Sequence, residues 1–179
     1  MTTALLIIDV QRALCEGPHE AFGAQALVER IDRLARQARQ AGAPVVIVQH
    51  ESSGPLLAYG SEGWQLARGL HTEPTDVLLR KTTPDSFHKT ALEALLRERQ
   101  VTRLVVCGMQ SDFCVDTTTR RALALGFAVV LVSDGHSTLD NEHLSAAQII
   151  AHHNTTLSNI ESFGPVVTLV ASQDVEFAR

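Results

Sequence analysis

Six short apolar segments constrain the fold of this chain more than any other feature. They lack the alternation of polar and apolar residues that marks a strand with one face in water. Strands of this kind are buried on both faces, which is typical of a parallel sheet covered by helices. The expected strands are residues 4–8, 45–48, 77–79, 104–106, 128–132 and 166–170.

Helical segments separate these strands. Residues 26–40 carry apolar side chains at helical spacing, and Gly42 and Pro44 end that pattern. The alternation of strand and helix along one chain predicts a layered α/β domain, and the 179 residues suit a single domain spanning 1–179. The other expected helices are residues 88–100, 115–125 and 141–152.

The segment from His50 to Thr75 shows no clear element and is rich in glycine and proline. A loop of this length in a compact domain usually serves function, so we expect it to form a lid or a pocket wall.

Composition excludes several classes of protein. The net charge of −5 disfavours binding to nucleic acid, which requires a basic surface. The longest apolar run, residues 122–132, is too short to span a membrane, and Asp9 interrupts the N-terminal run too early for a signal peptide. Three cysteines do not make a disulfide framework. We therefore expect a cytoplasmic protein with free thiols and no nucleic-acid or membrane partner.

Polar side chains gather where the expected strands end. Asp9 follows the first strand, Arg80 and Lys81 follow the third, and Cys114 begins the helix after the fourth. Taken singly, each has a simpler explanation as a turn former, a solvated cation or a core residue. Because ligands bind beyond the carboxyl ends of parallel strands, the sequence predicts an acid, a cation and a thiol on one rim.

This combination is suited to nucleophilic catalysis. A helix start and a nearby cation lower the pKa of a thiol, so we expect Cys114 to ionise readily. Asp9 could accept the thiol proton and return it to a leaving group, while Lys81 favours the ionised pair. Backbone N–H groups between Met109 and Cys114 could form an oxyanion hole. Cys107 is expected in the core, and the role of Cys15 stays open.

Three motifs carry a resemblance to a known family. They are "LLIIDVQ" with Asp9, "LRKTTPDSFHKTALEALL" with Lys81, and "VVCGMQSDFCVDTTTRRALALGFAVVLVSD" with Cys114. In this order and on these elements, the chain resembles the isochorismatase-like cysteine hydrolase superfamily over roughly residues 4–172.

The resemblance implies roles for individual residues. Asp9 is the implied general acid and base, Lys81 the cationic partner and Cys114 the nucleophile. A cis Met109–Gln110 peptide is implied before the nucleophile, which would direct the Gln110 N–H into an oxyanion hole shared with Cys114. The implied fold has three α/β/α layers around a mainly parallel six-stranded sheet, and the implied assembly is a homodimer or homotetramer.

Two differences between this chain and known branches of the superfamily narrow the choice of branch. Nicotinamidases carry an Asp-x-His metal motif after the second strand, where this chain has "QHESSG". We therefore expect no metal and no other cofactor, although His50, Glu51 and His71 could still assemble a metal site. True isochorismatases lack the cysteine, so the presence of Cys114 favours acyl transfer over vinyl-ether hydrolysis.

Pocket-lining residues are harder to assign, because apolar side chains in a long loop can equally pack the loop itself. The expected substrate is a small molecule, and the candidate residues around it are Leu14, Leu57, Tyr59, Trp64, Phe87, Met109 and His136.

The leading hypothesis is a cysteine amidohydrolase that cleaves a small amide or carbamoyl C–N bond through a thioester. A vinyl-ether or ester hydrolase on the same fold is the alternative enzyme. A non-catalytic thiol redox protein, with a reversible disulfide between Cys15 and Cys114, is the alternative from another class. A covalent acyl adduct on Cys114 would separate the hydrolase from the redox protein.

Overall fold

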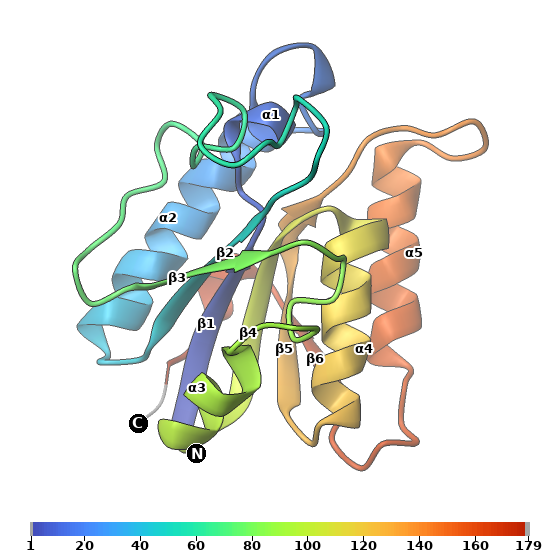
Figure 1. The fold of residues 1–179 in the computed structure, drawn as a ribbon. Coiled ribbons are helices and arrows are strands. Elements are labelled where there is room, and N and C mark those ends of the chain that lie inside the picture. The colour runs from blue at the N-terminus through green and yellow to red at the C-terminus, as the bar shows by residue number, and fades with distance from the viewer. Residues whose placement is uncertain (1, 178–179) are drawn as a thin grey trace.

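The structure is a computed structural model that describes residues 2–177. These residues form one six-stranded sheet in which every pairing is parallel, in the order β3-β2-β1-β4-β5-β6 (Figure 1). The strands are β1 (Thr2–Ile8), β2 (Val45–His50), β3 (Val77–Lys81), β4 (Val101–Met109), β5 (Ala128–Ser137) and β6 (Val167–Val170). The α-helices are α1 (Arg12–Cys15), α2 (Ala24–Gln40), α3 (Leu92–Glu98), α4 (Asp116–Ala124) and α5 (Ala146–Ser158).

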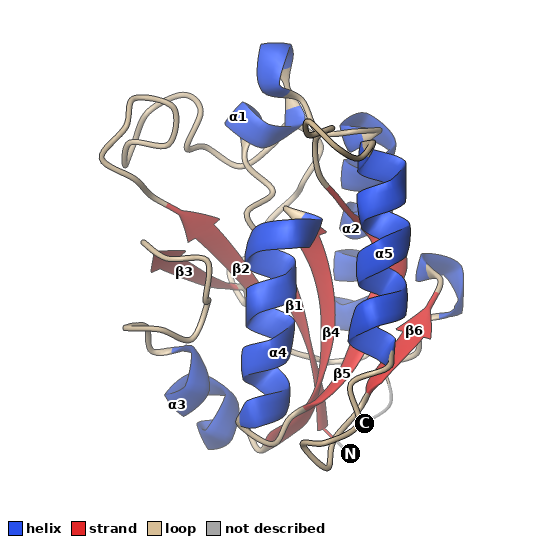
Figure 2. Cartoon of the chain, turned by 90° about the vertical axis from the view of Figure 1, so that its right-hand side faces the viewer, coloured by secondary structure: helices blue, strands red, loops and turns tan. Residues whose placement is uncertain are grey.

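Helices cover the two faces of the sheet unequally. Helix α2 packs on one face, and α3, α4 and α5 lie on the other (Figures 1 and 2). Successive residues of a strand point to opposite faces, so Leu5 and Ile7 join the core beneath α2, whereas Leu6 and Ile8 join the opposite core. This arrangement confirms the three-layer α/β/α fold.

The prediction that the strands are buried on both faces is confirmed for the central strands and is wrong for β3. Residues 3–8 of β1 are all buried. In β3, however, Leu78 and Arg80 are exposed while Lys81 is buried. The reason is that only one face of this edge strand is covered: Val77 and Leu79 pack against the core that includes residues of α3 and α4, whereas the opposite face is exposed.

Two helix boundaries differ from the expected ones. The segment at 88–100 forms a shorter helix, Leu92–Glu98, and the last helix begins at Ala146 rather than near residue 141. Ser145 caps this helix: its hydroxyl accepts a hydrogen bond from the Gln148 N–H, and the Gln148 side chain accepts one from the Ser145 N–H. This reciprocal pair is a capping box, which satisfies two N–H groups that the helix leaves free.

The segment between β2 and β3 is an irregular loop, as expected. Within the described residues its one β-bridge joins Leu66 to Gln11. The side chains of Gln11 and Gln49 donate hydrogen bonds of 2.9 and 3.0 Å to the carbonyl oxygen of Trp64. The loop is therefore held against the carboxyl ends of β1 and β2.

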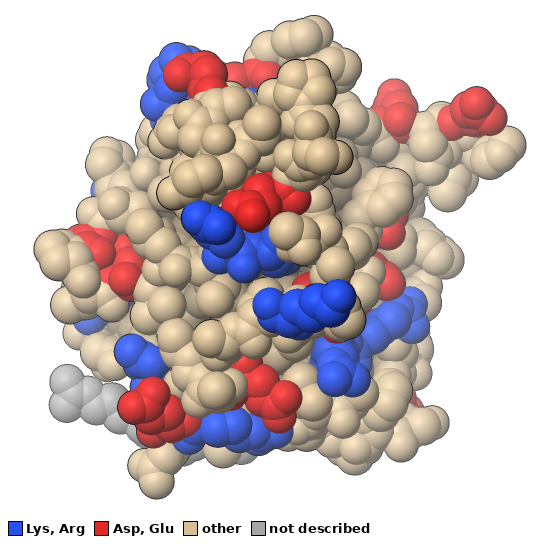
Figure 3. All heavy atoms as spheres, viewed as in Figure 1, with Lys and Arg blue, Asp and Glu red and all other residues tan. Residues whose placement is uncertain are grey.

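The surface carries mixed charge. On the face shown in Figure 3, basic and acidic side chains lie beside one another rather than in a field of one sign. None of the helices within residues 2–177 combines the length and the apolar composition that crossing a bilayer requires.

Candidate active site

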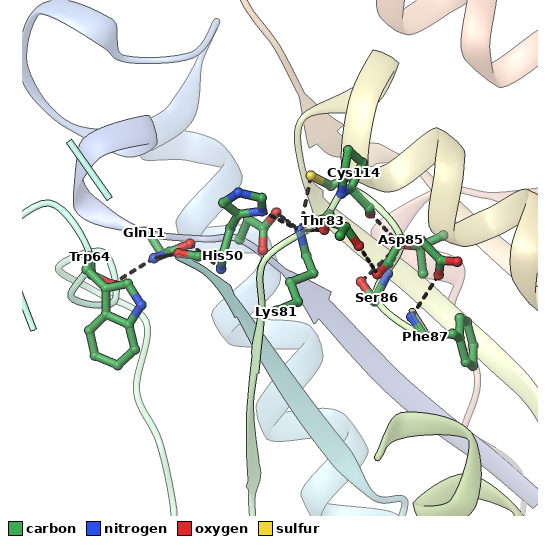
Figure 4. Close-up of polar contacts among 12 residues, drawn as sticks. Gln11, His50, Trp64, Lys81, Thr83, Asp85, Ser86, Phe87 and Cys114 are labelled. Carbon is green, nitrogen blue, oxygen red and sulfur yellow. Dashed lines mark hydrogen bonds and ion pairs between the residues drawn. The ribbon is translucent and has the colours of Figure 1, made fainter. Parts of the chain in front are cut away.

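Lys81 lies at the centre of a buried cluster at the carboxyl ends of the strands. Its Nζ is 2.7 Å from Asp9 Oδ2 and 3.1 Å from Cys114 Sγ. Figure 4 shows the Lys81 side chain extending between His50 and Cys114. The structure thus brings together the acid, the cation and the thiol that the sequence places at the ends of different strands.

Asp9 is held by a tight backbone turn. It follows β1 directly and adopts a left-handed conformation with φ of 52°. Its N–H donates to the Val48 carbonyl at 2.9 Å, and its own carbonyl accepts from the Gln11 N–H at 2.9 Å. Aspartate tolerates this conformation better than most residues. The turn directs a fully buried carboxylate toward Lys81, and Oδ1 has no hydrogen-bond partner among the described residues.

Cys114 lies on a π-helical turn between β4 and α4. The turn spans Ser111–Val115, and the peptide bond before it, Met109–Gln110, is cis. The N–H groups of Phe113 and Val115 both donate to the Gln110 carbonyl at 3.1 Å. The remaining backbone N–H groups of this turn are the candidates for an oxyanion hole, so the roles of Gln110 and Cys114 there stay a prediction.

A glycine missed in the sequence makes this geometry possible. Gly108 has φ of 123°, and a Cβ at this position would lie 2.0 Å from the Ile8 carbonyl oxygen. No side chain fits such a close approach of β1 and β4. The signal was present as the glycine of "CGMQ", directly before the nucleophile motif.

Electrostatics at the thiol differ from the expected pattern. Burial raises the pKa of Cys114 to about 12, and Asp9 acts in the same direction while Lys81 opposes both. The expected lowered thiol pKa is therefore wrong, because the helix start and Lys81 do not outweigh burial and the carboxylate. Burial also raises the pKa of Asp9, against the effect of Lys81. A carboxylate with a raised pKa is a stronger base, so it can take the thiol proton when attack begins.

His50 belongs to the cluster around Lys81, a position that the sequence did not predict. It ends β2, pairs in register with Lys81, and places its Nδ1 3.1 Å from Lys81 Nζ. Ligand atoms of Asp9, His50 and Cys114 all lie within 4.8 Å of one another. The Lys81 ammonium contacts each of these three side chains, so the positive charge among them is supplied by Lys81.

The three residues considered for a metal site do not assemble. Glu51 forms an ion pair with Arg80 at 3.1 Å, and His71 contacts Asp32 at 3.1 Å. Of the three, only His50 reaches the cluster around Lys81.

The loop after β3 is tied to α4. Lys81 Nζ donates to the Thr83 carbonyl at 3.1 Å, which fixes the start of the loop. Farther on, Thr118 Oγ1 lies 2.9 Å from Ser86 Oγ and 3.2 Å from the Pro84 carbonyl oxygen, and it accepts a hydrogen bond from the Ser86 N–H at 3.1 Å. The "TPDSF" sequence thus links the strand that carries Lys81 to the helix that follows Cys114.

Two of the expected lining residues, Phe87 and Met109, are buried in the protein core. Phe87 is only 7% exposed and stacks on Phe127 with ring centroids 6.0 Å apart. Met109 is completely buried, with its sulfur 3.8 Å from Cys15 Sγ. Both side chains take part in core packing, and their contact with a substrate stays a prediction.

His136, also expected to bind substrate, supports the nucleophile turn from behind. It is 3% exposed, and its Nε2 lies 2.9 Å from Asn154 Oδ1. Asn154 Nδ2 donates to the Ser133 carbonyl, so its Oδ1 accepts from His136. His136 Nδ1 is then the acceptor for the Ser111 hydroxyl at 2.7 Å. His136 therefore holds Ser111, the first residue of the π-helical turn.

The remaining candidates lie in or beside the long loop. Tyr59 is 63% exposed, packs edge-to-face on Trp64 with centroids 4.9 Å apart, and lies beneath the Arg80 guanidinium. Leu57 is half-buried in the same loop, and Leu14 packs against the core from α1. Contact of these four residues with a substrate stays a prediction.

Comparison with known proteins agrees with this geometry. The family model described as the isochorismatase domain matches residues 3–168. This chain belongs to the isochorismatase family. The superfamily inferred from the three motifs is thereby confirmed. A crystal structure of an isochorismatase family protein superposes with a TM-score of 0.85 at 39% identity, covering 94% of this chain and 98% of that one.

Two relatives within the isochorismatase family carry named activities. Streptothricin hydrolase of Streptomyces noursei is 41% identical over 138 residues, covering 76% of this chain and 50% of that protein. This chain thus spans about half the length of that relative. Ureidoacrylate amidohydrolase RutB of Methylobacterium radiotolerans is 29% identical over 208 residues, covering 96% of this chain and 78% of that protein.

Proposed function

We propose that the protein is a cysteine amidohydrolase that cleaves a small amide or carbamoyl C–N bond through a thioester. The observation that carries the proposal is the position of Lys81 Nζ, 2.7 Å from Asp9 Oδ2 and 3.1 Å from Cys114 Sγ. A nucleophile and a base that both contact one cation, with ligand atoms within 4.8 Å of each other, are the parts that acyl transfer requires.

Acylation uses all three side chains. As the Cys114 sulfur bonds to the substrate carbonyl carbon, its proton moves to Asp9. The negative charge that develops on the carbonyl oxygen is stabilised by Lys81 and by backbone N–H groups of the 110–114 turn. Asp9 then gives the proton to the leaving nitrogen, the C–N bond breaks, and ammonia or an amine departs. The product is a thioester on Cys114 and an ionised Asp9.

Deacylation reverses the proton movements. Water attacks the thioester carbon while Asp9 accepts one of its protons. The C–S bond then breaks, and the sulfur recovers its proton from Asp9. The acid product leaves, and the cluster returns to its starting charge.

The family relatives support the bond type. One is named a hydrolase and the other an amidohydrolase. An ester would pass through the same thioester, so an ester hydrolase stays the nearest alternative. The redox alternative is less favoured, because the buried Cys15 sulfur contacts the Met109 sulfur at 3.8 Å, whereas the Cys114 sulfur contacts Lys81.

The test is hydrolysis of a panel of small primary amides, ureido compounds and esters, followed by ammonia or alcohol release. Hydroxylamine added during turnover should trap the acyl group as a hydroxamate, and mass spectrometry should find the adduct on Cys114. Cys114→Ser should lose turnover, because a serine hydroxyl ionises far less readily than a thiol. Near-parental turnover in Cys114→Ser would overturn the proposal.

We further propose that the enzyme works in a reducing compartment such as the cytoplasm. The described cysteines Cys15, Cys107 and Cys114 are all free, and the mechanism requires a free thiol. The expected homodimer or homotetramer stays a prediction that light scattering can check.

A further inference from the structure

Lys81 has more hydrogen-bond acceptors around it than protons to donate. A lysine ammonium carries three N–H donors and no acceptor. Four atoms lie within hydrogen-bond distance of Nζ: Asp9 Oδ2 at 2.7 Å and the Thr83 carbonyl, His50 Nδ1 and Cys114 Sγ, each at 3.1 Å. One of the four contacts must therefore lack a proton at any moment.

Two of the four acceptors are expected to accept an N–H of Lys81 at all times. Asp9 is charged and gives the shortest contact, which makes it the strongest acceptor. The Thr83 carbonyl is backbone, fixed by the loop that Thr118 ties to α4. His50 Nδ1 and Cys114 Sγ remain to compete for the third proton.

His50 can accept only while its Nδ1 is unprotonated. Burial lowers the pKa of His50, and the Lys81 ammonium lowers it further, while Asp9 and Glu51 act in the opposite direction. A second positive charge 3.1 Å from Lys81 Nζ is unfavourable, so the neutral imidazole faces the ammonium and carries its own proton on Nε2. A thiol sulfur is a weak acceptor by comparison.

We propose that His50 is a positioning residue that withholds the third ammonium proton of Lys81 from Cys114 and so keeps the thiol protonated at rest. The inference rests on the proposed function in that it assigns Cys114 as the nucleophile. The consequence is a nucleophile that is protected from oxidation and alkylation, which attack the thiolate. Proton transfer from Cys114 to Asp9 during attack neutralises Asp9, weakens its hold on Lys81, and frees an N–H for the developing thiolate.

The test compares three variants by the rate at which iodoacetamide labels Cys114 without substrate, at several pH values near neutral. His50→Phe and His50→Leu remove the acceptor. His50→Asn keeps one, because its side-chain oxygen can stand near the position of Nδ1. If His50 holds the proton, the Phe and Leu variants should react about tenfold faster than wild type, corresponding to a fall of about one unit in the pKa of Cys114. His50→Asn should stay near the wild-type rate.

The three variants also separate proton competition from simple access. Asparagine is smaller than histidine and phenylalanine is larger, so an effect of access alone would make the Asn variant faster than the Phe variant. That order, or a Phe variant no faster than wild type, would overturn the proposal. His50→Leu serves if the Phe variant does not fold. Because labelling needs no turnover, failure to hydrolyse any amide would leave this result standing.

Discussion

Lys81 Nζ and Asp9 Oδ2 form a 2.7 Å ion pair whose side chains are 0% and 1% exposed. Removing one member of a buried pair leaves the other as an uncompensated charge, which costs several kcal/mol. The pair therefore couples the stability of the fold to the chemistry of the site.

Lys81→Met should lower the free energy of unfolding by about 3 kcal/mol above neutral pH. This loss should become smaller as the pH falls, because a protonated Asp9 is neutral and no longer leaves an unpaired buried charge. Urea denaturation at two pH values measures both effects. Arg80→Met is the control on the same strand: Arg80 is half-exposed, and we expect a change within about 1 kcal/mol. Equal losses in the two variants would contradict this account of the pair.

Asp9→Asn should have opposite effects on hydrolysis and on thiol labelling. Turnover should fall by roughly 10²-fold or more, because the base that accepts the thiol proton is gone. Labelling of Cys114 by iodoacetamide near neutral pH should instead become faster, because the Asp9 charge helps to raise the pKa of the thiol. Asp112→Asn, on the same turn as Cys114, should not accelerate labelling. Slower labelling in Asp9→Asn would show that Asp9 acts as the base in alkylation as well.

Two adjacent threonines of α4 provide a matched test of the loop that carries Lys81. Thr118 and Thr119 are both fully buried, but Thr118 Oγ1 bonds to the Pro84–Ser86 turn whereas Thr119 Oγ1 has no hydrogen-bond partner among the described residues. Thr118→Val should lower the free energy of unfolding by about 1–3 kcal/mol and reduce kcat, because polar groups of the Pro84–Ser86 turn lose their hydrogen-bond partner. Thr119→Val should be neutral or stabilising. Chemical denaturation of the two variants measures the difference. Similar losses of stability at both positions would argue against a stabilising link between Thr118 and the loop.

Acid should destabilise the protein partly through His136. Burial lowers the pKa of His136 in the folded protein below the value of about 6.5 that it has when unfolded. The unfolded state therefore binds the proton first, and the stability present above pH 6.5 is lost as the pH falls toward the folded pKa. One such proton changes stability by at most about 1.4 kcal/mol per pH unit.

His136→Gln should flatten the fall of Tm between about pH 7 and pH 5 relative to its own value at neutral pH. His50, whose pKa is also lowered, keeps part of the dependence in this variant. His152→Gln, an exposed position on α5, is the control and should leave the slope unchanged. If Tm of His136→Gln falls with pH as steeply as that of wild type, His136 does not contribute to the acid destabilisation.

The sequence allowed the fold and the three central residues to be predicted for one physical reason. Parallel strands present their carboxyl ends at one edge, so Asp9, Lys81 and Cys114 had to converge once the strands were recognised. His50 was not predictable as a neighbour of Lys81, because "QHE" does not reveal which face each side chain occupies. A shift of one residue would have placed Glu51 there instead.

Burial explains the other differences. His136 follows an apolar strand, and nothing in "SDGHSTLD" distinguishes a rim residue from one enclosed by Ser111 and Asn154. The direction of the Cys114 pKa depends on how far the thiol is removed from water, which is a property of the packed chain. A list of charged neighbours could not supply it.

The order of strands in the sheet has a consequence for how the chain is made on the ribosome. Leu5 of β1 pairs with Val45 on one side and with Val105 on the other. The first partner is synthesised soon after β1, whereas the second emerges about a hundred residues after it. During that interval the nascent chain displays the apolar edge of what becomes a central strand, a surface prone to pairing with other chains. We therefore expect folding to begin only when β4 has left the exit tunnel, with chaperones needed to shield β1 until then.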